Sequence, residues 1–239
     1  MLIKKCRSCN SKKISKLFSL GNLSFTGKFA TSIKKNIPSS DLSLIKCSKC
    51  HLVQLGRNFN IKYLYGSDYG YRTGINSTMT NHMKKVCAKL SKTVDLKKND
   101  AVLDIASNDG TLLNFYNKNV FTVGIDPTIK KYKKYYSKIN LPISDFFSFD
   151  KIKKKTKKKF KIISALSVFY DVKDPNVFLN EACNLLDENG ILMLEQADLS
   201  SIIKYKMFDT ICHEHLEYYS HEVIFQLAKK NNLKIFNMI

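Results

Sequence analysis

The chain contains no long apolar segment. No stretch of its 239 residues approaches the roughly 18 consecutive apolar residues that a membrane-spanning helix needs. The residues before Cys6 also lack the apolar region of a secretory signal peptide. We therefore expect a cytoplasmic protein with no membrane partner. In a reducing cytoplasm, its seven cysteines are more typical of metal ligands or buried thiols than of disulfides.

Acidic residues and arginine are both scarce. The chain has 20 Asp and Glu against 40 Lys and Arg, which gives a net charge of +20, and nearly all the positive charge is lysine. Such a surface can attract nucleic acid, anionic membranes or phosphorylated small molecules. The densest basic run, residues 151–159, has no interleaved aromatics for base stacking. We interpret it as a solvated helix face or loop and expect no nucleic-acid partner. A zinc-containing nucleic-acid-binding module is the non-enzymatic alternative.

Several common enzyme motifs are also absent. The chain has neither G-x-G-x-x-G nor a Walker loop, which disfavours dinucleotide and triphosphate binding. It has no zinc-protease H-E-x-x-H, because Glu217 stands where the second histidine would follow His213. No internal repeat is present. The 44% hydrophobic and 11% aromatic content is that of a globular protein, and the length allows about one or two domains.

Four cysteines form two C-x-x-C pairs near the N-terminus, Cys6 with Cys9 and Cys47 with Cys50. Four thiolates can surround Zn²⁺ tetrahedrally, and a closed four-sulfur site leaves no position open for catalysis. We therefore predict a structural zinc site in a domain of short strands and turns over residues 1–58. The second pair is followed by a histidine, so C-x-x-C-H haem attachment is an alternative; the absent export signal and the first cysteine pair disfavour it.

Beyond the cysteines, the pattern changes twice. Residues 59–98 form a connector rich in Tyr and Gly that ends in an expected helix over 78–92. From residue 99 to residue 239, apolar strands alternate with helices, which predicts an α/β domain with a parallel sheet covered on both faces. The expected strands of this domain are 101–106, 120–126, 141–145, 160–166, 191–195 and 233–239, and its expected helices are 111–117, 127–138, 175–186 and 222–232.

Two acidic turns follow neighbouring strands of this expected sheet. Asp104–Gly110 is a strand-to-helix turn in which glycine lets the backbone approach a ligand. About twenty residues later, Asp126 ends the next strand, where a carboxylate can accept hydrogen bonds from both hydroxyls of a ribose. Each feature alone could be a turn and a surface acid. Together, on consecutive strands, they favour a nucleoside cofactor.

A cluster of histidine, glutamate and tyrosine follows the fifth expected strand. His213, Glu214 and His215 are consecutive, and His221 lies a few residues later. At the ligand-binding edge of such a sheet, an imidazole with an ordinary pKa can act as a general base. The alternative is a set of surface histidines.

At these residues the chain resembles the sugar C-methyltransferases with an N-terminal zinc-binding domain, over almost its whole length. The matching motifs are Cys6-Arg7-Ser8-Cys9, Cys47-x-x-Cys50 followed by Leu52-Val53-Gln54-Leu55, Asp68-Tyr69-Gly70-Tyr71, Asp104-x-x-Ser107-Asn108-Asp109-Gly110, Gly124-Ile125-Asp126-Pro127 and His213-Glu214-His215. The resemblance implies a class I (Rossmann-like) methyltransferase that uses S-adenosylmethionine and a nucleotide-linked 4-keto sugar. A base would remove the proton next to the ketone, and the enolate would attack the sulfonium methyl.

The resemblance also assigns residues. It implies a catalytic role for His215, Glu214, His213, Tyr71 and Tyr69. It implies cofactor contacts from Asp104, Ser107, Asn108, Asp109, Gly110, Asp126, Pro127, Asp145 and Leu166. The basic surface would suit a diphosphate-bearing substrate.

Three departures from that family stand out. Cys212 replaces a tyrosine that usually precedes His-Glu-His, and Asp171 stands where a histidine is common. These departures suggest a different sugar or acceptor atom. The chain also stops at the expected sixth strand, whereas the family continues, so we expect a C-terminally truncated sequence. The alternatives are an O- or N-directed methyltransferase and an inactive remnant.

Overall fold

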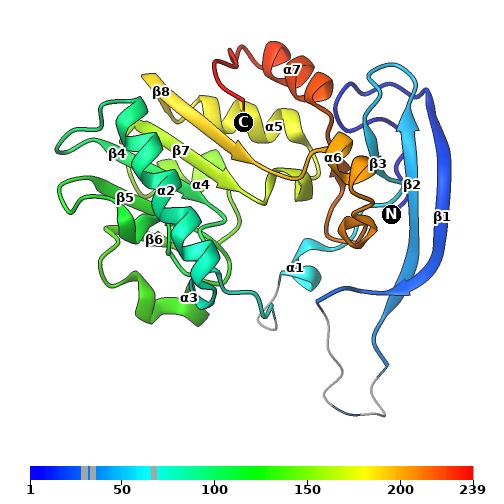
Figure 1. Cartoon of the computed structure of the whole chain (residues 1–239), viewed down its shortest axis with the longest axis horizontal. Coiled ribbons are helices and arrows are strands. Elements are labelled where there is room, and N and C mark those ends of the chain that lie inside the picture. The colour runs from blue at the N-terminus through cyan, green and yellow to red at the C-terminus, as the bar shows by residue number, and fades with distance from the viewer. Residues whose placement is uncertain (28–31, 33–35, 66–68, 239) are drawn as a thin grey trace. The chain divides into compact units, whose positions relative to one another are not determined.

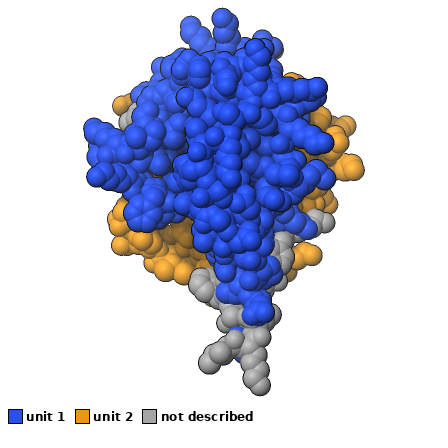
Figure 2. All heavy atoms as spheres, turned by 90° about the vertical axis from the view of Figure 1, so that its right-hand side faces the viewer, with its two compact units in different colours: residues 1–69, 169–179, 196–239 blue, residues 70–168, 180–195 orange. Residues whose placement is uncertain are grey.

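The computed structural model describes residues 1–27, 32, 36–65 and 69–238. The chain divides into two compact units, each assembled from separate segments, which Figure 2 distinguishes by colour. Unit 1 comprises residues 1–69, 169–179 and 196–239, and unit 2 comprises residues 70–168 and 180–195. These units group segments that lie far apart in the chain, whereas the division expected from the sequence was sequential and remains a prediction.

Unit 2 is built on the parallel sheet that the sequence predicts. Its five strands lie in the order β6-β5-β4-β7-β8 and all neighbouring pairs are parallel (Figure 1). The strands are β4 (Ala101–Ile105), β5 (Phe121–Ile125), β6 (Leu141–Ile143), β7 (Phe160–Leu166) and β8 (Leu186–Glu195). Every residue of the central strand β4 is buried, as expected for a strand covered on both faces.

Helix α2 (Ser77–Thr93) supplies the apolar face predicted before the sheet. Its N-cap Asn76 accepts hydrogen bonds from the backbone N–H groups of Thr78 and Met79. Its buried side chains Met83, Val86, Cys87 and Leu90 join the core that contains residues of β4 and β7. Packing therefore holds the connector helix in unit 2.

Two expected helices of unit 2 are shorter than predicted. Residues 111–117 form only the 3₁₀ turn Leu113–Phe115, because the Asn114 side chain donates to Gly110 O and Tyr135 O, contacts that compete with helix propagation. The segment 127–138 divides into α3 (Ile129–Tyr132) and a 3₁₀ turn, Lys133–Tyr136.

The lysine-rich run begins in a helix and continues as a loop, as expected for a solvated segment. Its first residues belong to α4 (Phe149–Lys153), and most side chains beyond Lys153 are exposed. Before β8, α5 (Pro175–Cys183) ends earlier than predicted. Gly190 lies within β8 where the register with β7 shifts, and a Cβ there would approach Phe160 O at 2.6 Å.

Unit 1 contains an antiparallel sheet that joins the two ends of the chain. Its order is β1-β2-β3-β9, formed by β1 (Ile14–Ser24), β2 (Ser39–Cys47), β3 (Val53–Leu55) and β9 (Glu217–Tyr218). The sequence did not predict β9, because two residues carry no recognisable periodicity. The remaining helices and 3₁₀ turns of this unit are α1 (Ile61–Leu64), α6 (Leu199–Lys204), α7 (His221–Lys230), Phe169–Asp171 and Phe208–Thr210.

The sixth strand expected over 233–239 is wrong for the part that the structure describes. Residues 233–238 form no regular element and pair with no described strand, although their burial partly alternates. An alternating pattern produces a strand only where a neighbouring strand completes its hydrogen bonds. Among the described residues, no helix is both long and apolar enough to cross a membrane.

Candidate functional site

The four predicted zinc ligands converge. The Sγ atoms of Cys6, Cys9, Cys47 and Cys50 all lie within 4.8 Å of one another. The Cys6–Cys50 and Cys9–Cys47 pairs are separated by 3.5 and 3.6 Å. A tetrahedral zinc with Zn–S bonds of about 2.3 Å requires sulfur–sulfur separations of roughly 3.8 Å. The cluster therefore fits a closed structural Zn²⁺ site.

Both cysteine pairs adopt the same turn. Asn10 N–H donates to Cys6 O at 2.9 Å, and His51 N–H donates to Cys47 O at 3.0 Å. Asn10 and His51 occupy the left-handed region, with φ of 58° and 63°. The second pair has the same turn as the first, and both contribute to one four-sulfur cluster. His51 therefore belongs to the turn of a zinc knuckle, which argues against haem attachment at this pair.

The turn after β4 has an unusual backbone. Ala106, Asn108 and Gly110 all have positive φ, and a Cβ on Gly110 would meet Ile139 Cδ1 at 2.5 Å. Ser107 Oγ lies 2.8 Å from Tyr136 Oη, which also donates to Asn108 O. Such a tight, glycine-dependent turn at the carboxyl edge of a parallel sheet is where open α/β folds bind ligands.

Asp126 follows β5 and is bound to that turn. Its Oδ2 accepts from Asn108 N–H at 3.0 Å, and its Oδ1 accepts from Thr128 N–H at 2.6 Å and from the Thr128 hydroxyl. Burial raises the pKa of this carboxyl, and the Thr128 and Asn108 donors oppose that shift. A carboxylate has about four acceptor positions, so these three bonds leave roughly one for a ligand hydroxyl.

Asp104 has an acceptor to spare. Its Oδ1 accepts from Ser164 Oγ at 2.6 Å, whereas no donor among the described residues reaches its Oδ2. Burial raises the pKa of Asp104 to about 7, partly offset by the Ser164 hydrogen bond. An open carboxylate oxygen in a desolvated position suits the cationic amino acid part of S-adenosylmethionine.

Asn108 and Asp109 instead hold the connector. Asn108 Oδ1 accepts from Thr73 N–H and its Nδ2 donates to Tyr71 O. Asp109 Oδ2 accepts from Gly74 N–H and Arg72 Nη1, and its Oδ1 accepts from Thr111. These two side chains, expected to contact the cofactor, are used inside the protein. Their cofactor role remains a prediction, and any direct contact would come from the backbone around them.

The connector contributes residues that were not predicted from the sequence. Arg72 pairs with buried Asp109 at 3.1 Å and lies over the Tyr135 ring at 4.6 Å. Gly74 has no room for a side chain, because a Cβ would lie 2.7 Å from both Asp109 Oδ2 and Thr111 Oγ1. Tyr71 is anchored through its carbonyl, while its side chain is 48% exposed. Asp68 of the same motif lies outside the described residues.

The other expected cofactor residues lie near the same edge. Pro127 follows Asp126, and Leu166 ends β7 opposite Glu195 of β8. Asp145 follows β6, and Lys151 Nζ lies 2.7 Å from its Oδ1. A second pair was not predicted: His82 Nε2 of α2 lies 2.7 Å from Glu195 Oε2.

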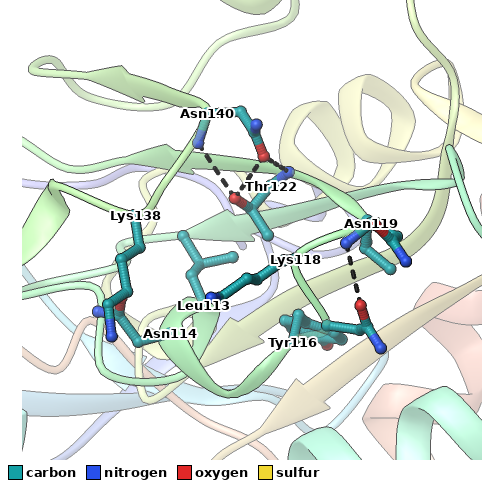
Figure 3. A pocket seen from close by; sticks show the side chains of 10 residues that line it. Leu113, Asn114, Tyr116, Lys118, Asn119, Thr122, Lys138 and Asn140 are labelled. Atoms are coloured by element: carbon teal, nitrogen blue, oxygen red, sulfur yellow. Dashed lines mark hydrogen bonds between the residues drawn. The ribbon is translucent and has the colours of Figure 1, made fainter.

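A pocket at the opposite edge of the sheet does not involve any predicted site residue. Figure 3 shows its lining around the amino end of β5, where Asn140 Oδ1 accepts from Thr122 N–H and the Thr122 hydroxyl. Lys118 and Lys138 also line it. Because the turn after β4 lies at the carboxyl edge, we do not assign this pocket to the cofactor.

In unit 1, His215 has the environment of a general base. Its Nδ1 lies 2.7 Å from Thr210 O, an atom that can only accept, so Nδ1 carries the proton and Nε2 keeps its lone pair. Burial lowers the pKa of His215, opposed by the Thr210 hydrogen bond and the Glu214 charge. The Tyr170 ring lies 4.3 Å from the imidazole centroid. The neutral, proton-accepting form therefore prevails at neutral pH.

The neighbours of His215 differ from it. His213 is 1% exposed, with Nε2 3.1 Å from Ser40 O and its ring against Phe25 and Phe59. Glu214 accepts a short hydrogen bond from the Thr26 hydroxyl. His213 is therefore placed to anchor the segment, while the surroundings of His215 are those of a reactive group; the catalytic assignments remain predictions.

A tyrosine–aspartate pair belongs to the same unit. Tyr65 Oη donates to Asp171 Oδ2 at 2.6 Å, and the Tyr69 ring meets the Tyr65 ring at 5.1 Å. Asp171 is buried, and burial raises its pKa, with the Glu214 charge adding to the shift and the Tyr65 hydrogen bond opposing it. The sequence singled out Asp171 but not Tyr65, because only the tertiary structure joins them.

The chain matches two known protein-family models. A family model described as a methyltransferase domain matches residues 75–237, which is more than half of the chain. The chain belongs to the methyltransferase domain family. A second model, described as a zinc binding domain, matches residues 6–65. The chain thus carries an S-adenosylmethionine-dependent methyltransferase domain and a zinc-binding domain, and the open Asp104 oxygen and the four-sulfur cluster fit these two groups.

The curated relatives that the chain matches have low sequence identity to it. The C-methyltransferase NovU of Streptomyces niveus is 23% identical over 82% of this chain and 47% of its own length. The ubiquinone biosynthesis O-methyltransferase of Pelagibacter ubique (strain HTCC1062) is 27% identical over 58% of this chain and 63% of its own. The chain therefore spans about half to two thirds of the curated relatives it matches.

Two of the solved structures to which the chain is similar are described as methyltransferases. The plantazolicin methyltransferase BamL, in complex with an analogue and SAH, is 20% identical over 65% of this chain and 57% of that chain, with a TM-score of 0.45. An S-adenosylmethionine-dependent methyltransferase from Clostridium acetobutylicum ATCC 824 is 14% identical over 53% of this chain and 54% of that chain, with a TM-score of 0.43.

The zinc site predicts a metal content of about one Zn²⁺ per chain. Substitution Cys9→Ser should lower that content, because serine removes one of four thiolate ligands. Elemental analysis of the purified protein measures the ratio, and Cys87→Ser, a buried thiol outside the cluster, is the control. Full zinc content in Cys9→Ser would contradict the assignment.

Asp126→Asn should weaken binding of S-adenosylmethionine at least about tenfold, since it removes the charge of the carboxylate that is predicted to accept from the cofactor ribose. Calorimetric titration of the zinc-loaded chain measures the affinity. Asp187→Asn is the matched control, because Asp187 pairs with Lys161 away from the turn. Unchanged affinity in a folded Asp126→Asn protein would remove this residue from the cofactor site.

The raised pKa of Asp104 predicts pH-dependent cofactor binding. A cationic ligand favours the ionised carboxylate, so below pH 7 binding must first displace a proton from Asp104. Affinity for S-adenosylmethionine should fall as the pH drops from 8 to 6, by at most about tenfold per unit. Asp104→Asn should bind weakly with a flatter pH profile; a profile like that of the wild type would refute the role of Asp104.

Proposed function

We propose that this chain is the catalytic part of a C-methyltransferase that acts on a nucleotide-linked 4-keto sugar. Unit 2 binds S-adenosylmethionine, which supplies a methyl group on a cationic sulfur. Unit 1 supplies the base. The observation that carries the proposal is His215, whose Nδ1 proton is held by Thr210 O and whose Nε2 lone pair is left to accept a proton.

The chemistry requires a base because a carbon next to a ketone is not nucleophilic until it loses a proton. His215 Nε2 accepts that proton, and the hydrogen bond at Nδ1 fixes the ring orientation and the tautomer. The adjacent Glu214 carboxylate stabilises the imidazolium that results, since its charge raises the pKa of His215. Burial lowers the pKa of His215, and the Glu214 charge opposes that shift. An imidazole balanced in this way can both accept and release a proton.

The Tyr65–Asp171 pair gives the same unit a neutral hydrogen-bonding group. Asp171 is buried and its pKa is raised, which favours its protonated form. Its Oδ1 has no partner among the described residues. We assign this pair to the acceptor side, where a neutral acid discriminates among sugar oxygens without repelling a diphosphate. Tyr69, in contact with Tyr65, belongs to this group.

Similarity to NovU, a C-methyltransferase, supports carbon as the acceptor, whereas similarity to the ubiquinone O-methyltransferase favours an oxygen acceptor as the second candidate. The two differ in one observable step. Carbon methylation requires cleavage of a C–H bond next to the ketone, and oxygen methylation leaves that bond intact.

His215→Gln should lower exchange of the keto-sugar α-proton for solvent deuterium by about 100-fold or more, because general-base catalysis contributes roughly that much. Proton NMR of a nucleotide-linked 4-keto sugar in D₂O measures the exchange. Since the base is the neutral imidazole and its pKa is lowered, the rate should be flat at neutral pH and fall only below about pH 6.5.

His221→Gln is the matched control, because His221 is exposed at the start of α7 and lies 3.6 Å from Asp198. It should exchange at the wild-type rate. If the wild-type chain binds S-adenosylmethionine but catalyses no exchange with keto sugars, the carbon-methylation proposal is wrong, and methyl transfer to oxygen becomes the function to test.

A further inference from the structure

One buried arginine connects the first zinc knuckle to the strand that follows the candidate base. Arg7 stands between the ligands Cys6 and Cys9 and is 6% exposed. Its guanidinium has a different acceptor on nearly every side. Nη1 donates to Leu55 O at 2.8 Å, Gln54 Oε1 at 3.3 Å and Leu216 O at 3.4 Å, and Nη2 donates to Arg57 O at 2.9 Å and Asn58 Oδ1 at 2.7 Å.

The remaining nitrogen of this arginine faces Glu217. Arg7 Nε lies 3.5 Å from Glu217 Oε1, and both side chains are almost completely excluded from solvent. Neither carboxylate oxygen of Glu217 has a hydrogen bond within the described part of the chain. Arg7 is therefore the charge partner of a buried acid at the first position of β9, and a buried pair of this kind tolerates loss of one member poorly.

The strand β9 and the candidate base are two residues apart. Leu216, between His215 and Glu217, accepts from Leu55 N–H at 2.9 Å and donates its own N–H to Tyr170 O at 2.8 Å. A shift of Glu217 or Leu216 therefore changes the direction from which the backbone presents His215. The Tyr170 ring packs against that imidazole. The hydrogen bond from Leu216 N–H to Tyr170 O therefore also fixes the position of this neighbouring ring.

The segment before β9 is held from the zinc-binding side as well. His213 Nε2 contacts Ser40 O of β2, and the Thr26 hydroxyl, just beyond β1, donates to Glu214. These contacts and the Arg7 bonds come from the region between and beside the two knuckles. The base segment is thus held by the zinc-binding region at several points, and Arg7 is the one that brings a buried charge.

We propose that Arg7 is a positioning residue for His215. Through Arg7, the zinc-bound structure of the first knuckle controls the geometry of the candidate base. Arginine suits this task because its planar fork serves acceptors on β3 and on the β9 side at once, which the single ammonium of lysine cannot do. The identification of His215 as the base rests on the proposed function, whereas the coupling of Arg7 to the segment 213–217 does not.

The test follows the imidazole signals of His215 by NMR, assigned with His215→Gln, in zinc-loaded protein. Arg7→Lys should retain zinc and S-adenosylmethionine affinity but shift the His215 resonances and their titration midpoint. It should lower keto-sugar proton exchange about tenfold or more through kcat, as a displaced base does. Arg57→Lys is the matched control, because the Arg57 side chain is half-exposed and its ion pair with Asp41 is long, at 3.8 Å.

Zinc removal provides a second arm on the unmodified chain. Chelation should displace the His215 signals, and added Zn²⁺ should restore them. If Arg7→Lys does not fold, Arg7→Met with Glu217→Met removes both buried charges and serves instead. Wild-type His215 signals in either folded variant, or signals indifferent to zinc, would overturn the proposal. These readouts need no methyl acceptor, so they remain valid even if the acceptor is not a keto sugar.

Discussion

The buried guanidinium of Arg7 is the interaction on which the architecture of unit 1 depends. It satisfies carbonyls on β3 and beside β9 and neutralises Glu217, none of which water can reach. A buried guanidinium is costly unless its charge is paired and most of its donors are bonded, and here β3, the β9 side and Glu217 together meet that need. Arg7, itself part of the first zinc knuckle's turn, therefore contacts both β3 and the segment that leads into β9.

In unit 2, the polar side chains at the carboxyl edge of the sheet have different hydrogen-bond partners. Asn108 and Asp109 turn toward the connector, where Asn108 binds Thr73 and Asp109 binds Arg72 and Gly74. Asp104 keeps an open oxygen. Three residues of the turn have positive φ, so successive side chains point to different partners. Asn108 and Asp109 bind the connector, whereas Asp104, in β4, does not.

Much of this protein could be predicted from the sequence because it depends on short-range patterns. The two C-x-x-C pairs predicted a four-sulfur cluster, since their spacing already forms the turns that end at Asn10 and His51. Apolar runs separated by helices predicted six strands, and five of them form the parallel sheet, because a strand buried on both faces must be continuously apolar. The predicted strand over 233–239 failed where the same local pattern lacked a neighbour to pair with.

The sequence by itself therefore determined the fold class, the cysteine cluster, the acids at the strand ends and the candidate base. Only the tertiary structure decided which of these side chains are free to react. It bound Asn108 and Asp109 to the connector, fixed the His215 tautomer through Thr210 O, and joined Tyr65 to Asp171 across more than a hundred residues. Those outcomes depend on the hydrogen-bond partner that folding brings to each group, whether it lies five residues away, as Thr210 does from His215, or 106, as Asp171 does from Tyr65. No local pattern encodes which partner a buried polar group will find.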